Sequence, residues 1–167
     1  MNLSLRPATK HDLALLDTWG RQPHVVAAGV DIDHWELESE LGRTVAWREY
    51  LIAEVNGRPL GFLQIIDPKL DEWHYWGDCL PNLRAIDIWI GNAEDLGKGY
   101  GTEMMKQAID RCFAAPDVNA IIIDPIESNT RAHKFYERLD FDFVERRKFA
   151  DDYCLVFRLD RSHCPPQ

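Results

Sequence analysis

The sequence lacks the marks of a protein that binds nucleic acid or spans a membrane. Of 167 residues, 19 are basic and 28 are acidic, which gives a formal net charge of −9. This balance argues against nucleic acid or an anionic membrane surface as a partner and fits a cationic one, although acidity also serves solubility alone. No apolar run approaches the roughly 18 residues of a membrane-spanning helix, and the N-terminus has no signal-like apolar segment.

Cysteine is present without a pattern. Cys79, Cys112, Cys154 and Cys164 form neither a C-x-x-C pair nor a metal-ligand spacing. We therefore expect no metal site and a reducing, cytoplasmic setting. Repeats and linkers are also lacking, and the length suits one domain. We expect that domain over residues 1–161, followed by a flexible, proline-containing tail at residues 162–167.

The most informative stretch is Ala85–Thr102, which reads AIDIWIGNAEDLGKGYGT. An apolar strand and a short loop precede three glycines, which stand immediately before a helix-forming run. Glycine lets the backbone approach a ligand closely, and a helix start directs unpaired N–H groups and a positive dipole end at it. The stretch predicts a phosphate or pyrophosphate ligand, with a simple tight turn as the alternative. The order and spacing of its residues match neither a Walker loop nor the G-x-G-x-x-G fingerprint.

Two motifs carry a family resemblance. Leu96-Gly97-Lys98-Gly99-Tyr100-Gly101 resembles the Gln/Arg-x-x-Gly-x-Gly/Ala coenzyme A loop of the GNAT N-acetyltransferases, with leucine at the usual Gln/Arg position. Downstream, Asn129–Phe141 resembles the family's Asn-x-x-Ala and Tyr-Glu-x-x-Gly-Phe elements, with Asp140 replacing the glycine. The order ID…NA…LGKG-x-GT, DP…SN-x-RA…YE most closely resembles the aminoglycoside 6′-N-acetyltransferases. The resemblance implies the α/β GNAT fold, a central mixed, mostly antiparallel, splayed sheet flanked by helices.

The resemblance also implies acetyl-CoA as the acetyl donor, with no metal. A backbone N–H between Ile88 and Ile90 is expected to stabilise the oxyanion of the transferring acetyl group. No side-chain nucleophile is required, because both substrates meet in a ternary complex. The residues expected at the coenzyme A site are Ile88, Trp89, Ile90, Leu96, Gly97, Lys98, Gly99, Tyr100, Gly101, Thr102, Asn129, Ala132 and Tyr136; Asn129 is also a plausible helix N-cap.

Acetyl transfer to an amine requires a neutral nitrogen, so a proton must be removed and another given to the departing thiolate. Asp67–Pro81 gathers aromatic and acidic side chains in an expected loop, which suits a sugar or amine. Asp71-Glu72-Trp73 matches the family's Asp-Gly-Trp loop with one gap, which makes Asp71, or Glu72 in its place, the base. We expect Trp73 and Trp76 in the substrate wall.

Three further residues are candidates for the acceptor site. Asp87 lies in an apolar strand, is costly to bury without a partner, and matches a substrate-contacting aspartate. Asp124 matches another, although aspartate before proline is also an ordinary turn opener. Tyr136 matches the tyrosine near the coenzyme A sulfur and is the candidate general acid. Carboxylates gathered in one cleft raise each other's pKa values, which suits a base that works near neutrality.

Periodicity and turn signals predict the remaining elements. The Asn56-Gly57 pair predicts a hairpin, and the segment after the glycines has the apolar spacing of a helix. We expect Pro23–Gly29 as a loop and Asp31–Thr44 as a solvated helix, with a second acidic wall of the cleft as the alternative for the latter segment. The other expected elements are strands at Leu3–Arg6, Tyr50–Val55, Leu60–Ile66, Ala120–Ile123, Phe141–Arg146 and Tyr153–Leu159, and helices at Leu13–Trp19, which Gly20 ends, at Gly101–Phe113 and at Asn129–Leu139.

These observations predict an N-acetyltransferase that acts on a small polycationic amine, such as the 6′-amine of an aminoglycoside. One alternative is an N-acyltransferase of the siderophore type or for another small amine or peptide; siderophore enzymes tend to carry histidine where this chain has Asp87. Another is a non-catalytic sensor of coenzyme A or an amine. Ala27-Ala28 stands where aminoglycoside enzymes can carry tryptophans, so the substrate is less defined than the reaction. We expect a monomer or homodimer.

Overall fold

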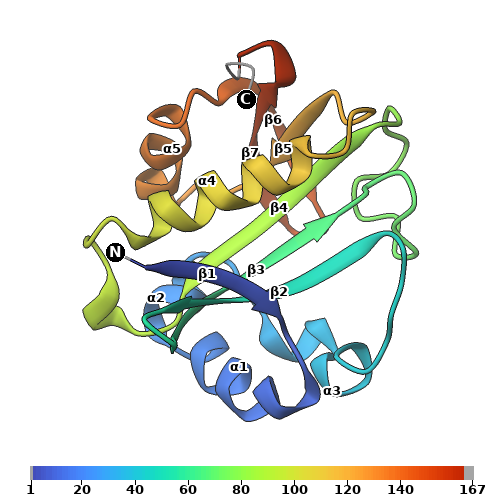
Figure 1. The fold of residues 1–167 in the computed structure, drawn as a ribbon. Coiled ribbons are helices and arrows are strands. Elements are labelled where there is room, and N and C mark those ends of the chain that lie inside the picture. The colour runs from blue at the N-terminus through green and yellow to red at the C-terminus, as the bar shows by residue number, and fades with distance from the viewer. Residues whose placement is uncertain (1, 164–167) are drawn as a thin grey trace.

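The computed structural model describes residues 2–163, and its centre is a seven-stranded sheet (Figure 1). The strands run in the order β1-β2-β3-β4-β5-β7-β6. Only β4 and β5 are parallel, and every other neighbouring pair is antiparallel, so the predicted mixed sheet is confirmed. The strand bounds are β1 Leu3–Pro7, β2 Arg48–Val55, β3 Arg58–Ile66, β4 Leu83–Ile90, β5 Ala120–Ile123, β6 Asp142–Phe149 and β7 Asp152–Asp160.

The sheet opens between β4 and β5. These strands pair only from Leu83–Ala85 to residues 120–122, and β5 ends at Ile123. The Gly91 N–H donates to the Leu60 carbonyl, which fixes the side on which each β4 residue bonds to β3. Because bonding direction alternates along a strand, Ile88 and Ile90 present their backbone groups to the β5 side. After Ala85, β4 therefore has an edge that β5 does not pair with, as the expected splay requires.

Helices cover both faces of the sheet. The longest, α4 (Tyr100–Phe113), and α5 (Thr130–Glu137) pack on one face, where Met104, Met105 and Tyr136 enter the largest apolar cluster. On the other face, Leu16 and Trp19 of α1 pack against Ile52, Phe62 and Trp89 of the sheet. The remaining helical segments are η1 Lys10–Asp12, α1 Leu13–Gly20, α2 Pro23–Ala27, η2 Ile32–Trp35, α3 Leu37–Glu40, η3 Ala93–Asp95 and η4 Arg161–His163.

Two expectations for the N-terminal segment were wrong. The predicted loop at Pro23–Gly29 contains α2, because Pro23 occupies the first helical turn, where its missing N–H costs nothing. The predicted helix at Asp31–Thr44 is two short pieces, η2 and α3, separated by Glu36 in the left-handed region at φ +48°. The break turns Glu40 inward, where it meets Arg48.

The hairpins follow the turn signals more closely. Asn56 and Gly57 both have positive φ, at +50° and +78°, as a two-residue type I′ turn requires. The last hairpin turns at Ala150 and Asp151, one residue earlier than expected. Of the expected tail, Ser162 and His163 belong to η4, and residues 164–167 lie outside the described residues. Within residues 2–163, no helix is long and apolar enough to cross a membrane.

Gly91, which follows β4, supports the packing of α1. A Cβ at this position would overlap the indole ring of Trp19, which is buried. We expect Gly91→Ala to lower the free energy of unfolding by about 2–3 kcal/mol, because the packed indole has no room to move. Urea denaturation measures the change. As the matched control, Gly101→Ala in the first turn of α4 meets only Phe135 at 3.8 Å, and a loss equal to that of Gly91→Ala would contradict the steric explanation.

Candidate functional site

A row of polar side chains crosses the sheet on the face that α1 covers. Tyr50 of β2 stands opposite Gln64 of β3, and Gln64 stands opposite Asp87 of β4. Ala85 pairs with Ile122, so the same step along β4 and β5 leads from Asp87 to Asp124. Apolar clusters lie on the two sides of this row, one around Phe62 and Trp89 and the other around Ile66 and Trp76. The row therefore interrupts an otherwise apolar face.

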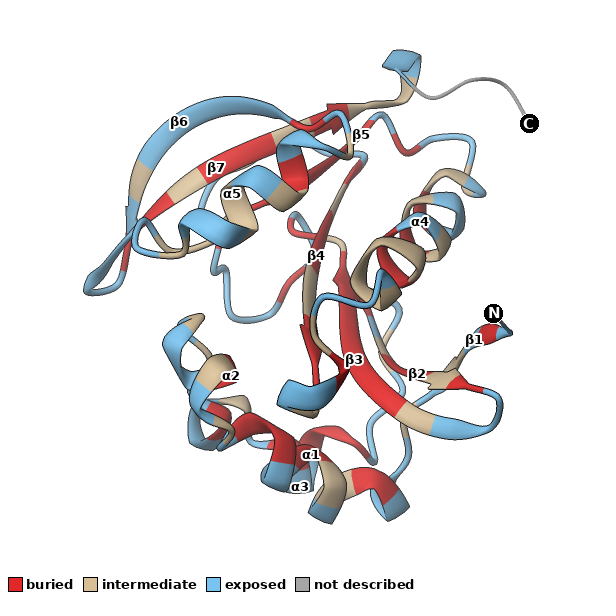
Figure 2. Ribbon diagram, turned by 90° about the vertical axis from the view of Figure 1, so that its left-hand side faces the viewer, coloured by how far each residue is buried: buried red, intermediate tan, exposed pale blue. Residues whose placement is uncertain are grey.

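A cavity of about 880 Å³ lies over this row and continues to the start of α4. Figure 2 shows α2 and α5 on opposite sides of the place where β4 and β5 separate. Both helices contribute to the cavity wall, His24 and Val25 from α2 and Tyr136 from α5. The cavity thus joins the glycine loop to the half-buried carboxylates Asp87 and Asp124 in one continuous space.

The glycine loop forms one end of the cavity. Gly97 and Gly99 have φ angles of +74° and +83°, which L side chains rarely adopt. A Cβ at either position would meet no atom within 4 Å, so the backbone faces open space at the N-terminus of the 14-residue helix α4. This arrangement fits an anion such as a pyrophosphate. Leu96 packs against the main apolar cluster and has no charge to offer.

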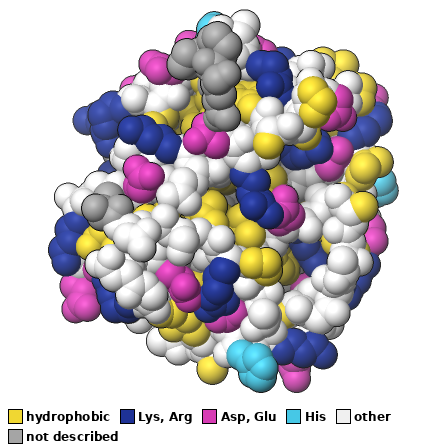
Figure 3. Space-filling model, viewed as in Figure 1, with side chains coloured by type: hydrophobic (Ala, Val, Ile, Leu, Met, Phe, Trp, Pro, Cys, Tyr) yellow, Lys and Arg dark blue, Asp and Glu magenta, His cyan; other side chains and the backbone are white. Residues whose placement is uncertain are grey.

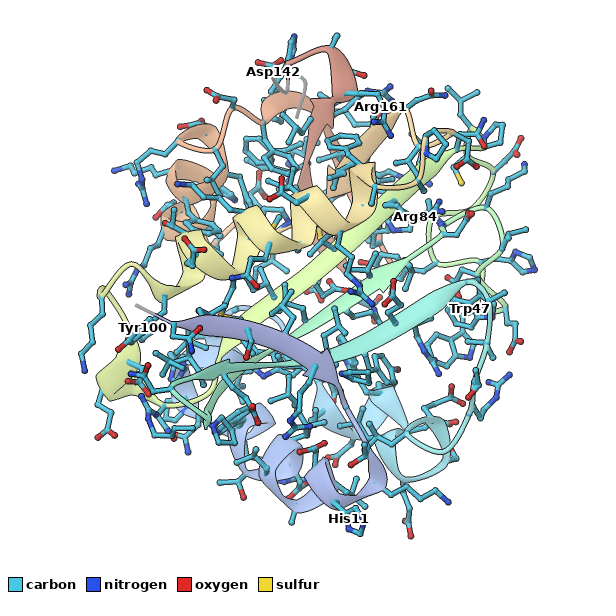
Figure 4. All side chains as sticks on the ribbon, in the orientation of Figure 1. His11, Trp47, Arg84, Tyr100, Asp142 and Arg161 are labelled. Carbon is cyan, nitrogen blue, oxygen red and sulfur yellow. The ribbon has the colours of Figure 1, made fainter. Side chains whose placement is uncertain are left out.

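Most residues expected at the coenzyme A site line this part of the cavity. They are Ile88, Trp89, Ile90, Leu96, Gly97, Gly99, Gly101, Thr102, Asn129, Ala132 and Tyr136. Lys98 and Tyr100 are not among the lining residues; Figure 4 labels Tyr100 at the start of α4, far from Trp47 at the acceptor end. Asn129 caps α5, because its Oδ1 accepts a hydrogen bond from the Ala132 N–H at 3.1 Å.

Asp87 and Asp124 are the acidic groups at the centre of the cavity. Asp87 Oδ2 accepts a hydrogen bond from Gln64 Nε2 at 2.7 Å, and burial raises the pKa of Asp87 to about 6. Burial, followed by repulsion from Asp87, raises the pKa of Asp124 to about 8. Within residues 2–163, neither carboxylate has an ion-pair partner. A positively charged group in the cavity would therefore be stabilised by both carboxylates.

Asp71 shapes the loop in which it lies. Its side chain is almost fully buried, and its two oxygens accept hydrogen bonds from the backbone N–H groups of Trp73 and Tyr75, both at 3.1 Å. Glu72 does not line the cavity; both of its oxygens bind Arg43, at 3.0 and 2.8 Å. Asp71 therefore lines the same cavity as Asp87 and Asp124, with both of its oxygens engaged by the backbone, whereas Glu72 lies outside the lining.

The other expected residues lie in the cavity wall. Trp73 is half exposed and Trp76 is buried against Phe149, and both line the cavity. Tyr136 is 7% exposed, and burial raises the pKa of its phenol above the usual range, so it stays protonated at neutral pH.

Sequence reasoning missed several residues of the wall, among them His24, Gln64, Tyr75 and Phe149. His24 Nε2 lies 2.9 Å from the Ile90 carbonyl, at the free edge of β4. Gln64 carried a usable signal, because it is the one polar side chain within the run GFLQII, the same observation that singled out Asp87. Tyr75 and Phe149 come together only in the fold, since 74 positions separate them.

Comparison with known proteins agrees with this geometry. The acetyltransferase (GNAT) domain family matches residues 8–149. The aminoglycoside N(6′)-acetyltransferase type 1 of Klebsiella pneumoniae is 32% identical over 157 residues, covering 84% of this chain and 74% of the relative. A kanamycin resistance protein of Rhizobium radiobacter is 40% identical over 74 residues, 44% of this chain and 68% of the relative.

Solved structures show the same fold. The crystal structure of aminoglycoside acetyltransferase AAC(6′)-Ib with coenzyme A and kanamycin matches with a TM-score of 0.86 at 29% identity, covering 96% of each chain. The complex of the same enzyme with paromomycin and acetyl-CoA matches with a TM-score of 0.85 at 30% identity, over 97% of this chain and 95% of the other. The chain belongs to the GNAT acetyltransferase family and is an N-acetyltransferase.

Proposed function

We propose that this enzyme transfers the acetyl group of acetyl-CoA to the 6′-amine of an aminoglycoside and so confers resistance to it. The carrying observation is the pair of cation-free carboxylates, Asp87 and Asp124, in a cavity continuous with the glycine loop. A polycationic amine supplies the missing positive charge. The named activity of the Klebsiella relative and the kanamycin complex of AAC(6′)-Ib support this substrate.

The donor end of the cavity fits acetyl-CoA, which would supply the activated acetyl group. The N–H groups at the start of α4 would hold its pyrophosphate, as helix N-termini do for phosphates. The free edge of β4 offers the N–H groups of Ile88 and Ile90 to the pantetheine arm and to the acetyl oxygen. Asn129 and Ala132 would flank the arm from the other side.

Asp87 is the base in this proposal, in place of Asp71 or Glu72. A base must reach the amine proton, and the oxygens of Asp71 are engaged by backbone N–H groups while Glu72 is paired outside the cavity. Asp87 has a raised pKa that suits proton removal near neutrality, and Asp124 anchors the ammonium group beside it. The raised pKa of Tyr136 keeps its phenol protonated before the reaction, so that it can donate this proton to the departing thiolate.

We propose direct transfer in a ternary complex, which is supported by a cavity that runs without interruption from the glycine loop to Asp87 and Asp124. Basic and acidic side chains are interspersed on the face in Figure 3, which supports a small-molecule acceptor rather than a nucleic acid. We place the enzyme in the cytoplasm, in keeping with the cysteine pattern of its sequence.

The proposed function is tested by thiol release from acetyl-CoA against a panel of amines. We expect turnover with kanamycin and none with an aminoglycoside that carries a hydroxyl at the 6′ position, since a protonated amine is what the carboxylate pair attracts. Spermidine, lysine and hydroxylysine derivatives and an N-terminal peptide complete the panel. Turnover confined to one of these would reassign the acceptor. Tight coenzyme A binding without turnover on any amine would instead favour a sensor.

A further inference from the structure

Tyr75 joins three parts of the acceptor end of the cavity. Its backbone N–H donates to Asp71, and its hydroxyl donates to Asp124 Oδ2 at 2.5 Å. Its ring stacks on Phe149 of β6, with ring centroids 4.8 Å apart and planes 8° from parallel. The residue is 48% exposed, so the ring lies at the rim of the cavity and not in the core.

The stacking of the ring on Phe149 positions the hydroxyl, but the stacking itself does not depend on the hydroxyl. A phenylalanine at position 75 would keep the contact with Phe149 and the backbone bond to Asp71. What it would lose is the side-chain hydrogen bond to Asp124, the one that the described part of the chain provides. The hydroxyl at the rim points to the half-buried carboxylate of Asp124. A donor at that position stabilises the ionised form of Asp124.

Other ionisable groups also face Asp124, each from a different element. Asp87 of β4 opposes its ionisation, whereas Arg147 of β6 favours it. The remaining groups are Cys154 of β7 and Tyr136 of α5, whose own ionisation the Asp124 charge opposes. The Tyr75 hydroxyl and Arg147 therefore lower the pKa of Asp124, whereas burial and the charge of Asp87 raise it.

We propose that Tyr75 is a positioning residue for the acceptor, whose hydroxyl favours the ionised form of Asp124 and holds its carboxylate toward the incoming ammonium group. The inference rests on the proposed function only in that the cation is the substrate amine. Proton removal and proton return belong to Asp87 and Tyr136, so Tyr75 acts on substrate binding and not on the chemical step. Phe149 acts through Tyr75, because it holds the ring in place.

The first test is Tyr75→Phe, assayed with kanamycin and acetyl-CoA. We expect the KM for kanamycin to rise about tenfold at pH 7, the value of a hydrogen bond to a charged group, with kcat within about twofold of wild type. Loss of the hydroxyl raises the pKa of Asp124, so less of it is ionised at pH 7. The difference in KM therefore narrows between pH 7 and 8.5. Tyr153→Phe, a tyrosine outside the cavity lining, is the matched control and leaves KM unchanged.

The second test needs no turnover. Carbon-13 NMR titration of the Asp124 carboxyl should give a higher pKa in Tyr75→Phe than in wild type, and an intermediate value in Phe149→Leu. An unchanged pKa, an unchanged KM, or a lower KM in Tyr75→Phe would overturn the inference; a lower KM would mean that the hydroxyl competes with the amine. If the wild-type enzyme neither binds nor acetylates kanamycin, the proposed function fails, and the titration still decides whether Tyr75 controls Asp124.

Discussion

Asp87→Asn is expected to lower kcat/KM for the acceptor amine by about 10²–10⁴-fold, the usual contribution of a positioned general base. Asparagine keeps the shape of the side chain and can still bond to Gln64, but it cannot accept the amine proton. The acceptor also loses one of the two negative charges that draw it into the cavity. Initial rates with kanamycin and saturating acetyl-CoA measure the loss.

The pH profile separates Asp87 from a residue that only shapes the cavity. A base must be ionised, so wild-type kcat/KM should fall as the pH drops through the range of about 8 to 6 where Asp124 and Asp87 gain protons. In Asp87→Asn the charge that raises the pKa of Asp124 is gone. The residual activity should therefore persist to lower pH than in wild type.

Stability provides the control for this variant. Burial raises the folded-state pKa of Asp87 above its ordinary value of 3.8, so its ionised form opposes folding above about pH 6. Asp87→Asn should unfold at the same or a higher urea concentration than wild type at pH 7. Asp142→Asn, an exposed carboxylate on β6 labelled in Figure 4, should change neither rate nor stability. Near wild-type turnover in Asp87→Asn would return the base role to another group.

Glu40→Gln is expected to lower the free energy of unfolding by about 3–5 kcal/mol, the cost of removing one partner from a buried ion pair. Glu40 and Arg48 have side chains only 6% and 2% exposed, and Arg43 also bonds to both Glu40 oxygens at 3.1 Å. The Arg48 guanidinium lies over the Tyr50 ring, 4.1 Å from its centroid. Without the carboxylate, a positive charge stays buried against aromatic rings with no counter-ion.

Urea denaturation measures this loss, with Glu38→Gln on the exposed side of α3 as the matched control. The double variant Glu40→Leu/Arg48→Met removes both charges and should recover most of the stability, because a well-packed apolar pair needs no counter-ion. A Glu40→Gln loss no larger than that of Glu38→Gln would show that Arg48 reaches solvent or another anion.

The sequence predicted those parts of the site that are local in the chain. The strand, glycine loop and α4 follow one another within Ala85–Phe113, so spacing and backbone preference were sufficient. Asp87 was recognisable because a carboxylate in an apolar strand is unusual. The Asn56-Gly57 hairpin was equally clear, because its turn requires positive φ at both positions.

Features that depend on distant contacts were not predictable in the same way. The break at Glu36 turns Glu40 inward toward Arg48, and this contact lies outside the stretch whose periodicity predicted a helix. Asp71 matched the family loop in sequence, yet its bonds to Trp73 and Tyr75 give it a backbone role that only the folded loop reveals. The link from Tyr75 to Asp124 spans 49 positions and left no trace in spacing.

The Asp67–Pro81 loop is secured to the rest of the fold by side chains and contributes no strand to the sheet. Arg84 holds Asp67, Arg43 holds Glu72, and Arg147 donates to the Trp76 carbonyl. The length and the amino-acid sequence of this loop can therefore change without disturbing the register of β3 and β4, on which the position of Asp87 depends. Under selection by a new antibiotic, we expect substitutions to accumulate in this loop, because they can change the range of acceptors while the groups that transfer the acetyl group stay in place.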